Sequence, residues 1–369
     1  MFENFNIPAE LIPSDPRFGC GPSLIPMSYV ESLLATGPHL LGTSHRQDAF
    51  KKMFKEIQDG LKKYFEVPAD YEVVIGNGGA TFLFDMIGLG IVKEKAVHYT
   101  CGEFSNKWFK SSDSIPWISA EERAFDYGQG VSYSNHKEFD LVAVTLNETS
   151  TGVQIDELPS VNDDQILAID ATSGAGQVPC DVSKTDIFFF SPQKVFASEG
   201  GIFVAIMSPK AIKRSEEVAK LGRYIPEIMS WKQAIENCRK NSTYNTPSIT
   251  SLFFLNEQVK EMNKLGYKKC QELAQKKADL LYGWAKEKSY LSAYVTEDKF
   301  KSTAVATIDI DDKYSADDLC KVLLDKRIAY GIDAYRKLGR NQFRISMFHN
   351  IKIEDLEKLT KIISKAIEG

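Results

Sequence analysis

The chain has 369 residues, of which 43% are hydrophobic and 26% are charged, and its formal net charge is −5. This length exceeds one simple domain and suits two or three domains with a large buried core. The small acidic excess excludes the basic footprint of a nucleic-acid-binding protein and disfavours an anionic membrane surface. We therefore expect neither nucleic acid nor membrane among its partners.

Six cysteines lie scattered along the chain, with no CxxC pair and no metal-ligand spacing. We therefore predict no metal site and interpret the cysteines as buried free thiols. The first ten residues, MFENFNIPAE, lack the basic start and apolar core of a signal peptide. No apolar run reaches the roughly 18 residues that a membrane helix needs. The expected location is a reducing cytoplasm.

The first two-thirds of the chain reads as an α/β domain. Residues 1–26 hold five prolines and predict an extended arm. A helix with apolar residues at helical spacing is predicted at 48–65, and a buried helix at 81–90. Strands are predicted at 71–76, 140–146, 165–170, 186–190 and 201–207. Short, nearly continuous apolar runs are typical of strands covered on both faces, so we predict a mostly parallel sheet flanked by helices.

The pattern changes after about residue 208. A long helical stretch at 249–288 is followed by strands at 304–310, 328–332 and 342–348 and helices at 316–326 and 353–367. This order predicts a smaller C-terminal α+β domain. The predicted organisation is an arm at 1–26, a large domain at 27–258 and a small domain at 259–369.

Asp170 and Lys194 each follow an apolar strand. Alone, Asp170 is as readily a helix cap, and Lys194 as readily a lysine that extends to the surface. They stand 194 − 170 = 24 residues apart, one strand–loop–strand step, so both reach the sheet edge where α/β proteins bind ligands. Burial leaves a lysine neutral and nucleophilic. A lysine at the aldehyde carbon and a carboxylate at the ring nitrogen is the arrangement of pyridoxal 5'-phosphate (PLP) catalysis.

A glycine-rich turn, Gly76-Asn-Gly-Gly-Ala-Thr81, lies between a predicted strand and an apolar helix. Glycines let the backbone approach a ligand, and a helix N-terminus presents free N–H groups to an anion. The turn matches neither GxGxxG nor the P-loop, and a simple tight turn is the alternative. Its place before Asp170 and Lys194 favours a phosphate site.

These residues together resemble the fold-type I PLP-dependent aminotransferases, and within them the phosphoserine aminotransferase family. The resemblance covers nearly the whole chain. It is carried by Gly19-Cys-Gly-Pro-Ser23, Thr43-Ser-His-Arg46, Gly78-Gly-Ala-Thr81, Asn147-Glu-Thr149, Asp170, Ser191-Pro-Gln-Lys194, Asn245-Thr246-Pro247 and Phe343-Arg344. It implies a homodimer with shared active sites. The implied reaction moves an amino group between O-phospho-L-serine and 2-oxoglutarate, giving 3-phosphohydroxypyruvate and glutamate in serine biosynthesis.

The resemblance also implies roles for individual residues. Lys194 is similar to the family's Schiff-base lysine, and Asp170 to the partner of the pyridinium nitrogen. The other cofactor residues are Gly79, Ala80, Thr81 and Gln193 at the phosphate, Thr149 at the ring hydroxyl and Phe104 on the ring, with Asn245 and Thr246 from the neighbouring subunit. Arg46 and Arg344 resemble the arginines that bind substrate carboxylates, for which a bidentate fork is suited.

The sequence departs from the common family pattern at three places. Phe104 stands where a tryptophan is usual, Ala80 where an arginine is usual, and the segment Tyr335–Arg344 lacks a His-Arg pair. The chain thus resembles a divergent branch, in which Arg336, Lys337 and Arg340, with His45, are the candidates for binding the substrate phosphate. Whether a phosphorylated hydroxythreonine is a second substrate stays open.

Three alternative functions also stay open. The first is a related transaminase that uses alanine or serine with glyoxylate. The second is a PLP lyase or desulfurase, which is disfavoured because no cysteine stands in a suitable position and Ala171, not a histidine, follows Asp170. The third is a non-catalytic or nucleotide-binding α/β protein in which Lys194 is structural.

Overall fold

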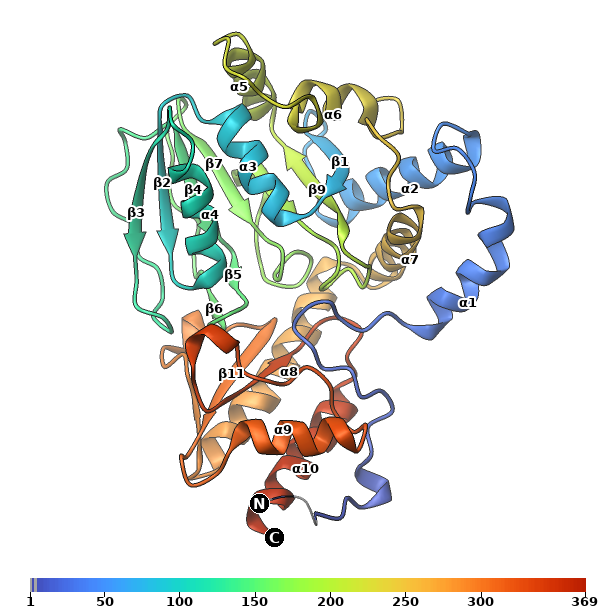
Figure 1. Cartoon of the computed structure of the whole chain (residues 1–369), viewed down its shortest axis with the longest axis vertical. Coiled ribbons are helices and arrows are strands. Elements are labelled where there is room, and N and C mark those ends of the chain that lie inside the picture. Colours follow the sequence, from blue (N-terminus) through green and yellow to red (C-terminus); the bar gives the residue numbers. More distant parts are fainter. Residues whose placement is uncertain (1, 3–4) are drawn as a thin grey trace.

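A seven-stranded sheet forms the centre of the larger of two parts in this computed structural model, which describes residue 2 and residues 5–369 (Figure 1). Its strand order is β1 (Glu72–Gly78), β9 (Gly201–Met207), β8 (Ile187–Phe190), β7 (Ile166–Asp170), β4 (Leu141–Thr145), β2 (Lys95–Thr100) and β3 (Ser119–Ala124). Only β9 runs against its neighbours, since β1 and β8 both pair with it antiparallel, whereas the remaining pairs are parallel. The predicted mostly parallel α/β sheet is confirmed.

Helices cover both faces of this sheet because its central strands are apolar on both sides. Every residue of β4, β7 and β8 is buried, whereas the edge strand β3, with the sequence SAEERA, is partly exposed. The helices of this part are α1 (Met27–Thr36), α2 (Asp48–Tyr64), α3 (Ala80–Ile91), α4 (Glu103–Asp113), α5 (Pro209–Ala219), α6 (Trp231–Cys238) and α7 (Ile249–Leu265). In Figure 1, α3 and α4 cross the near face of the sheet, while α2 and α7 lie beside β1 and β9.

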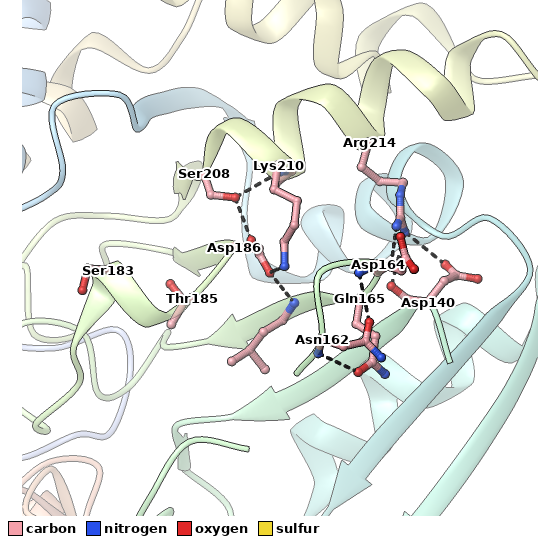
Figure 2. A network of polar contacts seen from close by, with 12 residues as sticks. Asp140, Asn162, Asp164, Gln165, Ser183, Thr185, Asp186, Ser208, Lys210 and Arg214 are labelled. Carbon is pink, nitrogen blue, oxygen red and sulfur yellow. Dashed lines mark hydrogen bonds and ion pairs between the residues drawn. The ribbon is translucent and has the colours of Figure 1, made fainter. Parts of the chain in front are cut away.

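Polar side chains hold the edge of the sheet at which the parallel strands begin (Figure 2). Asp140, Gln165 and Asp186 stand directly before β4, β7 and β8. Arg214, from α5, donates to the carbonyl oxygen of Asp140 at 3.3 Å, and Lys210 pairs with Asp186 at 2.9 Å. Because this edge is satisfied internally, the opposite edge, where the strands end, is the one open to a ligand.

The smaller part contains a three-stranded antiparallel sheet, β10 (Leu291–Ala293), β11 (Val305–Ile310) and β12 (Gln342–Ser346). Its helices are α8 (Tyr267–Glu287), α9 (Ala316–Asp325) and α10 (Ile353–Glu368). The proline-rich arm packs here: Ser14 donates twice to Asp355 of α10, at 2.6 and 2.7 Å. The Phe18 amide donates to the Tyr330 carbonyl at 3.1 Å. From there the arm enters the region between the two sheets (Figure 1).

Two element predictions need correction. Residues 328–332 form no strand, because this segment pairs only through isolated bridges, such as that between Arg17 and Tyr330. The stretch 249–288 is two helices, separated at Gly266, whose φ of 84° ends α7. The boundary predicted at residue 258 falls inside α7, which packs against α2. In the part of the chain that the structure describes, no helix combines the length and apolarity needed to cross a membrane.

Candidate active site

A cavity of about 510 Å³ opens where the parallel strands end. Nine of the residues predicted for the site line it: Gly79, Ala80, Thr81, Phe104, Thr149, Asp170, Gln193, Lys194 and Arg344. They come from the ends of β1, β7 and β8, the first turns of α3 and α4, and the small-domain strand β12, with Thr149 directly after the short strand β5 (Asn147–Glu148). Residues spread over more than 260 positions of sequence therefore face one space, as the ordered motifs predicted.

Lys194 is buried, with 8% of its surface exposed, and its Nζ donates to Thr149 Oγ1 at 2.8 Å. Burial lowers the pKa of Lys194 to about 8, an effect that the charge of Asp170 partly opposes. A lysine with such a pKa is partly neutral near physiological pH and can act as a nucleophile. The neighbouring Gly21, with φ of 128°, leaves room for this side chain, since a Cβ there would stand 2.8 Å from Lys194 Cε.

Asp170 ends β7 and is also buried. Its Oδ1 accepts from the Thr172 amide at 2.9 Å and from the Thr172 hydroxyl at 2.6 Å. Burial raises the pKa of Asp170 to about 6, although the two bonds from Thr172 and the charge of Lys194 lower it. Oδ2 accepts no hydrogen bond from a described residue, so it is available to a donor inside the cavity.

The glycine turn leads into α3, as predicted, and Gly79 is the N-cap of the helix. The amides of Ala80 and Thr81 lie in the first turn, where backbone N–H groups lack partners within the helix. We find no acceptor for either amide among residues 2 and 5–369. The turn thus presents free donors and the positive end of the helix dipole to the cavity, as an anion site requires.

Several polar atoms around the cavity are buried and have no partner among the described residues. They are Thr145 Oγ1, Asn147 Oδ1, Gln193 Oε1 and Arg344 Nε. Buried polar groups are costly unless a partner satisfies them. A cavity with a nucleophilic lysine, a free carboxylate oxygen, an anion-binding turn and unpaired donors and acceptors fits a polar, phosphorylated aromatic group such as PLP.

Two aromatic residues, Phe104 and Tyr335, line the cavity between the two parts of the molecule. Phe104 lies with its ring centroid 5.1 Å from Lys194 Nζ and meets the Tyr335 ring edge-on at 5.7 Å. The Arg344 guanidinium lies 5.3 Å from the centre of the Tyr335 ring. No carboxylate of a described residue pairs with Arg344, and its Nη1 donates a long hydrogen bond, 3.5 Å, to the Thr149 carbonyl oxygen, so its charge is available to an anion.

Four predicted residues lie outside this cavity, in a separate group. His45 Nδ1 is 3.3 Å from Thr246 Oγ1, and Arg46 and Asn245 are exposed beside them. Asn77 Nδ2, next to the glycine turn, donates to the Thr246 carbonyl at 2.8 Å. The structure thus gathers the four residues near the phosphate turn but does not bring them to the cavity of their own chain.

The predicted basic residues near position 340 line a second cavity of about 820 Å³, which shares Tyr335 and Arg344 with the first. Arg340 is already paired: its Nη2 lies 2.5 Å from Asp309 Oδ2, and its guanidinium stacks on Tyr294 at 4.2 Å. Lys337 pairs with Glu103 of α4 at 2.9 Å. Arg336 is exposed and forms no ion pair with a described residue, so it is the uncompensated cation of this group.

Sequence reasoning missed three residues that contact this site. Tyr335 was noted only as the start of a basic segment, and Gly21 and Cys20 only as part of a motif. No cysteine was expected near the site, yet Cys20 lines the cavity, and its Sγ lies 3.5 Å from the Arg344 carbonyl oxygen. The signal was the motif Gly19-Cys-Gly-Pro-Ser23 itself, whose glycines indicate a close approach of the backbone to a ligand.

Comparison with known proteins agrees with this geometry. The profile of the family described as aminotransferase class-V matches residues 27–359. A phosphoserine aminotransferase of Rhodococcus opacus (strain B4) is 40% identical over 360 residues, covering 97% of this chain and 96% of that protein.

Solved structures show the same fold. A phosphoserine aminotransferase from Cytophaga hutchinsonii has a TM-score of 0.86 at 23% identity, covering 95% of this chain and 99% of that one. A PLP-bound phosphoserine aminotransferase from Trichomonas vaginalis has a TM-score of 0.82 at 20% identity, with coverage of 95% and 99%. The chain belongs to the aminotransferase class-V family, which confirms the resemblance read from its motifs.

Proposed function

We propose that this protein is a PLP-dependent phosphoserine aminotransferase, which exchanges the amino group between O-phospho-L-serine and 2-oxoglutarate. The observation that carries the proposal is the meeting of Lys194, Thr149 and Asp170 in one cavity. Full-length relatives of that name at 40% identity support the substrate, and the PLP-bound relative supports the cofactor.

The cavity offers a partner for each polar part of the cofactor. PLP, when bound, supplies an electron sink for the bond that breaks at the substrate α-carbon. Lys194 would hold it covalently through Nζ, and Asp170 Oδ2 would hold a proton on the ring nitrogen. The amides of Ala80 and Thr81 would hold the phosphate, and Phe104 would cover one face of the ring.

Lys194 is also placed to move the proton in the reaction. Its Nζ accepts the proton that leaves the substrate α-carbon and returns one when the product forms. A pKa of about 8 makes the amine a base near neutral pH. Thr149 Oγ1, at 2.8 Å, holds Nζ in position, and the Phe104 ring lies beside the same amine, with its centroid 5.1 Å from Nζ.

Arg344 and Arg336 divide the substrate between them in this proposal. Arg344 lines the first cavity, forms no ion pair with a described residue and keeps an unsatisfied Nε, and it would bind the carboxylate of both substrates. Arg336 lies in the adjoining cavity and would bind the phosphate of phosphoserine. Arg340, whose charge Asp309 compensates, would contribute less than was predicted from the sequence.

We further propose a homodimer in which His45, Arg46, Asn245 and Thr246 complete the neighbouring subunit's site. Support comes from their position outside their own chain's cavity. Support also comes from α1, which exposes 59% of Met27 and 80% of Leu34 to solvent, the kind of apolar face that marks an interface. The six free cysteines support a reducing cytoplasm as the location.

The first test is the cofactor itself. The purified protein should show the visible band of lysine-bound PLP, and borohydride should bleach the band and leave the cofactor on the peptide that contains Lys194. A protein that stays colourless with added PLP would refute the cofactor. A Lys194→Ala variant that keeps the band and turnover would refute the assignment of the lysine.

The second test separates the substrates. Half-reactions with phosphoserine, serine, alanine and glutamate should show a strong preference for phosphoserine and glutamate, lost for phosphoserine alone in Arg336→Ala. Equal rates with alanine or serine and glyoxylate would favour the related transaminase. A desulfurase is disfavoured because burial raises the pKa of the Cys20 thiol and so keeps it from acting as a thiolate.

A further inference from the structure

Glu148 is a buried carboxylate that does not line the cavity but stands between two residues that do, Asn147 and Thr149. Its exposed fraction is 0%. No lysine, arginine or histidine of a described residue pairs with it. Burying a carboxylate costs free energy unless other groups donate hydrogen bonds to it. The donors around Glu148 therefore indicate its role.

The partners of Glu148 are the first turn of α4 and the adjoining Ser150. Oε2 accepts from the Ser105 amide and the Ser105 hydroxyl, both at 2.9 Å, and Oε1 accepts from the Phe104 amide at 3.3 Å. The amide and hydroxyl of Ser150 donate to Oε1 at 3.2 and 2.7 Å. Backbone N–H groups only donate, so both carboxylate oxygens of Glu148 act as acceptors at the positive end of the 11-residue helix α4.

The helix start and the carboxylate fit each other closely. Gly102, the N-cap of α4, has no Cβ, and a Cβ at this position would overlap Glu148 Cγ and Cδ. The N-terminus of α4 is therefore occupied by the chain's own carboxylate, whereas the N-terminus of α3 keeps its amides free for the cavity. The two helix starts therefore differ: the first amides of α4 donate to Glu148, whereas those of α3 have no acceptor among the described residues.

Both neighbours of this carboxylate act in the cavity. Phe104 is the second residue of α4, so the bond from its amide to Glu148 fixes where its ring lies over Lys194. Thr149 follows Glu148 directly, and its Oγ1 receives the hydrogen bond from Lys194 Nζ. We propose that Glu148 is a positioning residue that holds Phe104 against the cofactor ring and Thr149 against Lys194. This inference rests on the cofactor placement proposed above.

A helix cap alone would give the same contacts, so the control must loosen α4 without touching the cavity. Glu122 provides it: its Oε1 accepts from Asn106 Nδ2 of α4 at 2.7 Å and from Thr100 Oγ1 at 2.8 Å. Glu122 does not line the cavity. In each variant, Glu148→Gln and Glu122→Gln, an amide of the same size replaces a carboxylate that accepts a hydrogen bond from α4. Only Glu148 is bonded to Phe104 and adjacent to Thr149.

The experiment titrates the apoproteins of wild type, Glu148→Gln and Glu122→Gln with PLP and follows the dissociation constant and the circular dichroism of the visible cofactor band. In Glu148→Gln the new NH₂ group faces amide donors, so Phe104 shifts. We expect PLP to bind about tenfold more weakly, equivalent to about 1.4 kcal/mol, with a changed dichroism per bound cofactor. Glu122→Gln should lower the thermal midpoint and leave both cofactor readouts near wild type.

Three outcomes decide the matter. Wild-type dissociation constant and dichroism in Glu148→Gln would overturn the positioning role, as would equal changes in Glu122→Gln. Failure of the wild-type apoprotein to bind PLP would instead refute the proposed function before any variant is considered.

If Glu148→Gln does not fold, Ser150→Ala tests the same coupling when it is made both in wild type and in a Phe104→Leu background. Losing the bond from the Ser150 hydroxyl to Glu148 should weaken PLP binding in wild type but much less once the Phe104 ring is gone. Equal losses in both backgrounds would overturn the proposal.

Discussion

Replacing Lys194 by methionine removes a buried cation from the apoprotein, and we expect the folded apoprotein to become more stable at neutral pH. The pKa of Lys194 falls from 10.5 to about 8 on folding, chiefly because burial disfavours the charged amine. At about 1.36 kcal/mol for each tenfold change in proton affinity, keeping the lysine charged in the folded state costs about 3 kcal/mol. Methionine loses the hydrogen bond to Thr149, worth about 1 kcal/mol. The net gain is about 2 kcal/mol.

The sign of the pH dependence follows from the same shift. The folded-state pKa lies below the unfolded-state value, so the unfolded chain binds more protons between pH 8 and 10.5, and wild-type stability rises with pH in that window. Below pH 8 the full cost applies. The free energy of unfolding that Lys194→Met gains over wild type should therefore be largest at pH 7, and it should be smaller by about 2 kcal/mol at pH ~9.5.

Urea denaturation of the two apoproteins at both pH values measures this difference directly. Lys110→Met, an exposed lysine on α4, is the matched control and should match wild type at both. A Lys194→Met apoprotein that is less stable than wild type at pH 7 would refute the reasoning. So would an advantage that does not change with pH, because its source would then be packing and not charge.

Three further predictions concern the bound states. Asp170→Asn should keep the visible cofactor band but lower the transamination rate by roughly 100-fold in stopped-flow half-reactions, since an amide cannot hold the ring proton as a carboxylate does; an unchanged rate would contradict this role. Arg344→Lys should raise the KM for both substrates by about tenfold with kcat less affected, because lysine lacks the bidentate fork; wild-type KM would argue for another carboxylate ligand. Lys107 Nζ lies 3.4 Å from Thr81 Oγ1, beside the proposed phosphate site. Lys107→Met should therefore weaken PLP binding by up to about fivefold and leave the binding of phosphate-free pyridoxal unchanged in the same titration. Equal effects on both ligands would show that Lys107 does not act on the phosphate.

The core of the site was predictable because strand ends carry it. Apolar runs located β4, β7, β8 and β9 within one or two residues, and because β4, β7 and β8 run parallel, their last residues share one edge. Asp170 and the segment up to Lys194 follow from that rule alone. The glycine turn before α3 follows from helix-terminus chemistry. Each of these signals is local, so a single sequence contains it.

The errors arose where distant segments decide the structure. Residues 328–332 form a short apolar run of the kind that predicts a strand, yet their neighbour is the N-terminal arm, which offers only the bridge from Arg17 to Tyr330. The edge strand β3 has a polar sequence and is formed by pairing with β2. Arg340 looked free because its partner Asp309 lies 31 residues away on a neighbouring strand. Local propensity carries no information about such pairings.

The charges in the site also show why the cofactor and the fold depend on each other. Glu148 is satisfied inside the apoprotein by the start of α4, whereas Lys194 and Asp170 are compensated chiefly by Thr149, Thr172 and each other. Covalent attachment would remove the cation of Lys194, and a protonated ring nitrogen would give Asp170 its opposite charge. PLP binding should thus stabilise the fold, and this charge compensation is part of the binding free energy that does so. Lys194, the buried lysine that first marked the site in the sequence, destabilises the folded apoprotein because burial disfavours its charge. The same residue would hold the cofactor, so its function explains why the fold retains it.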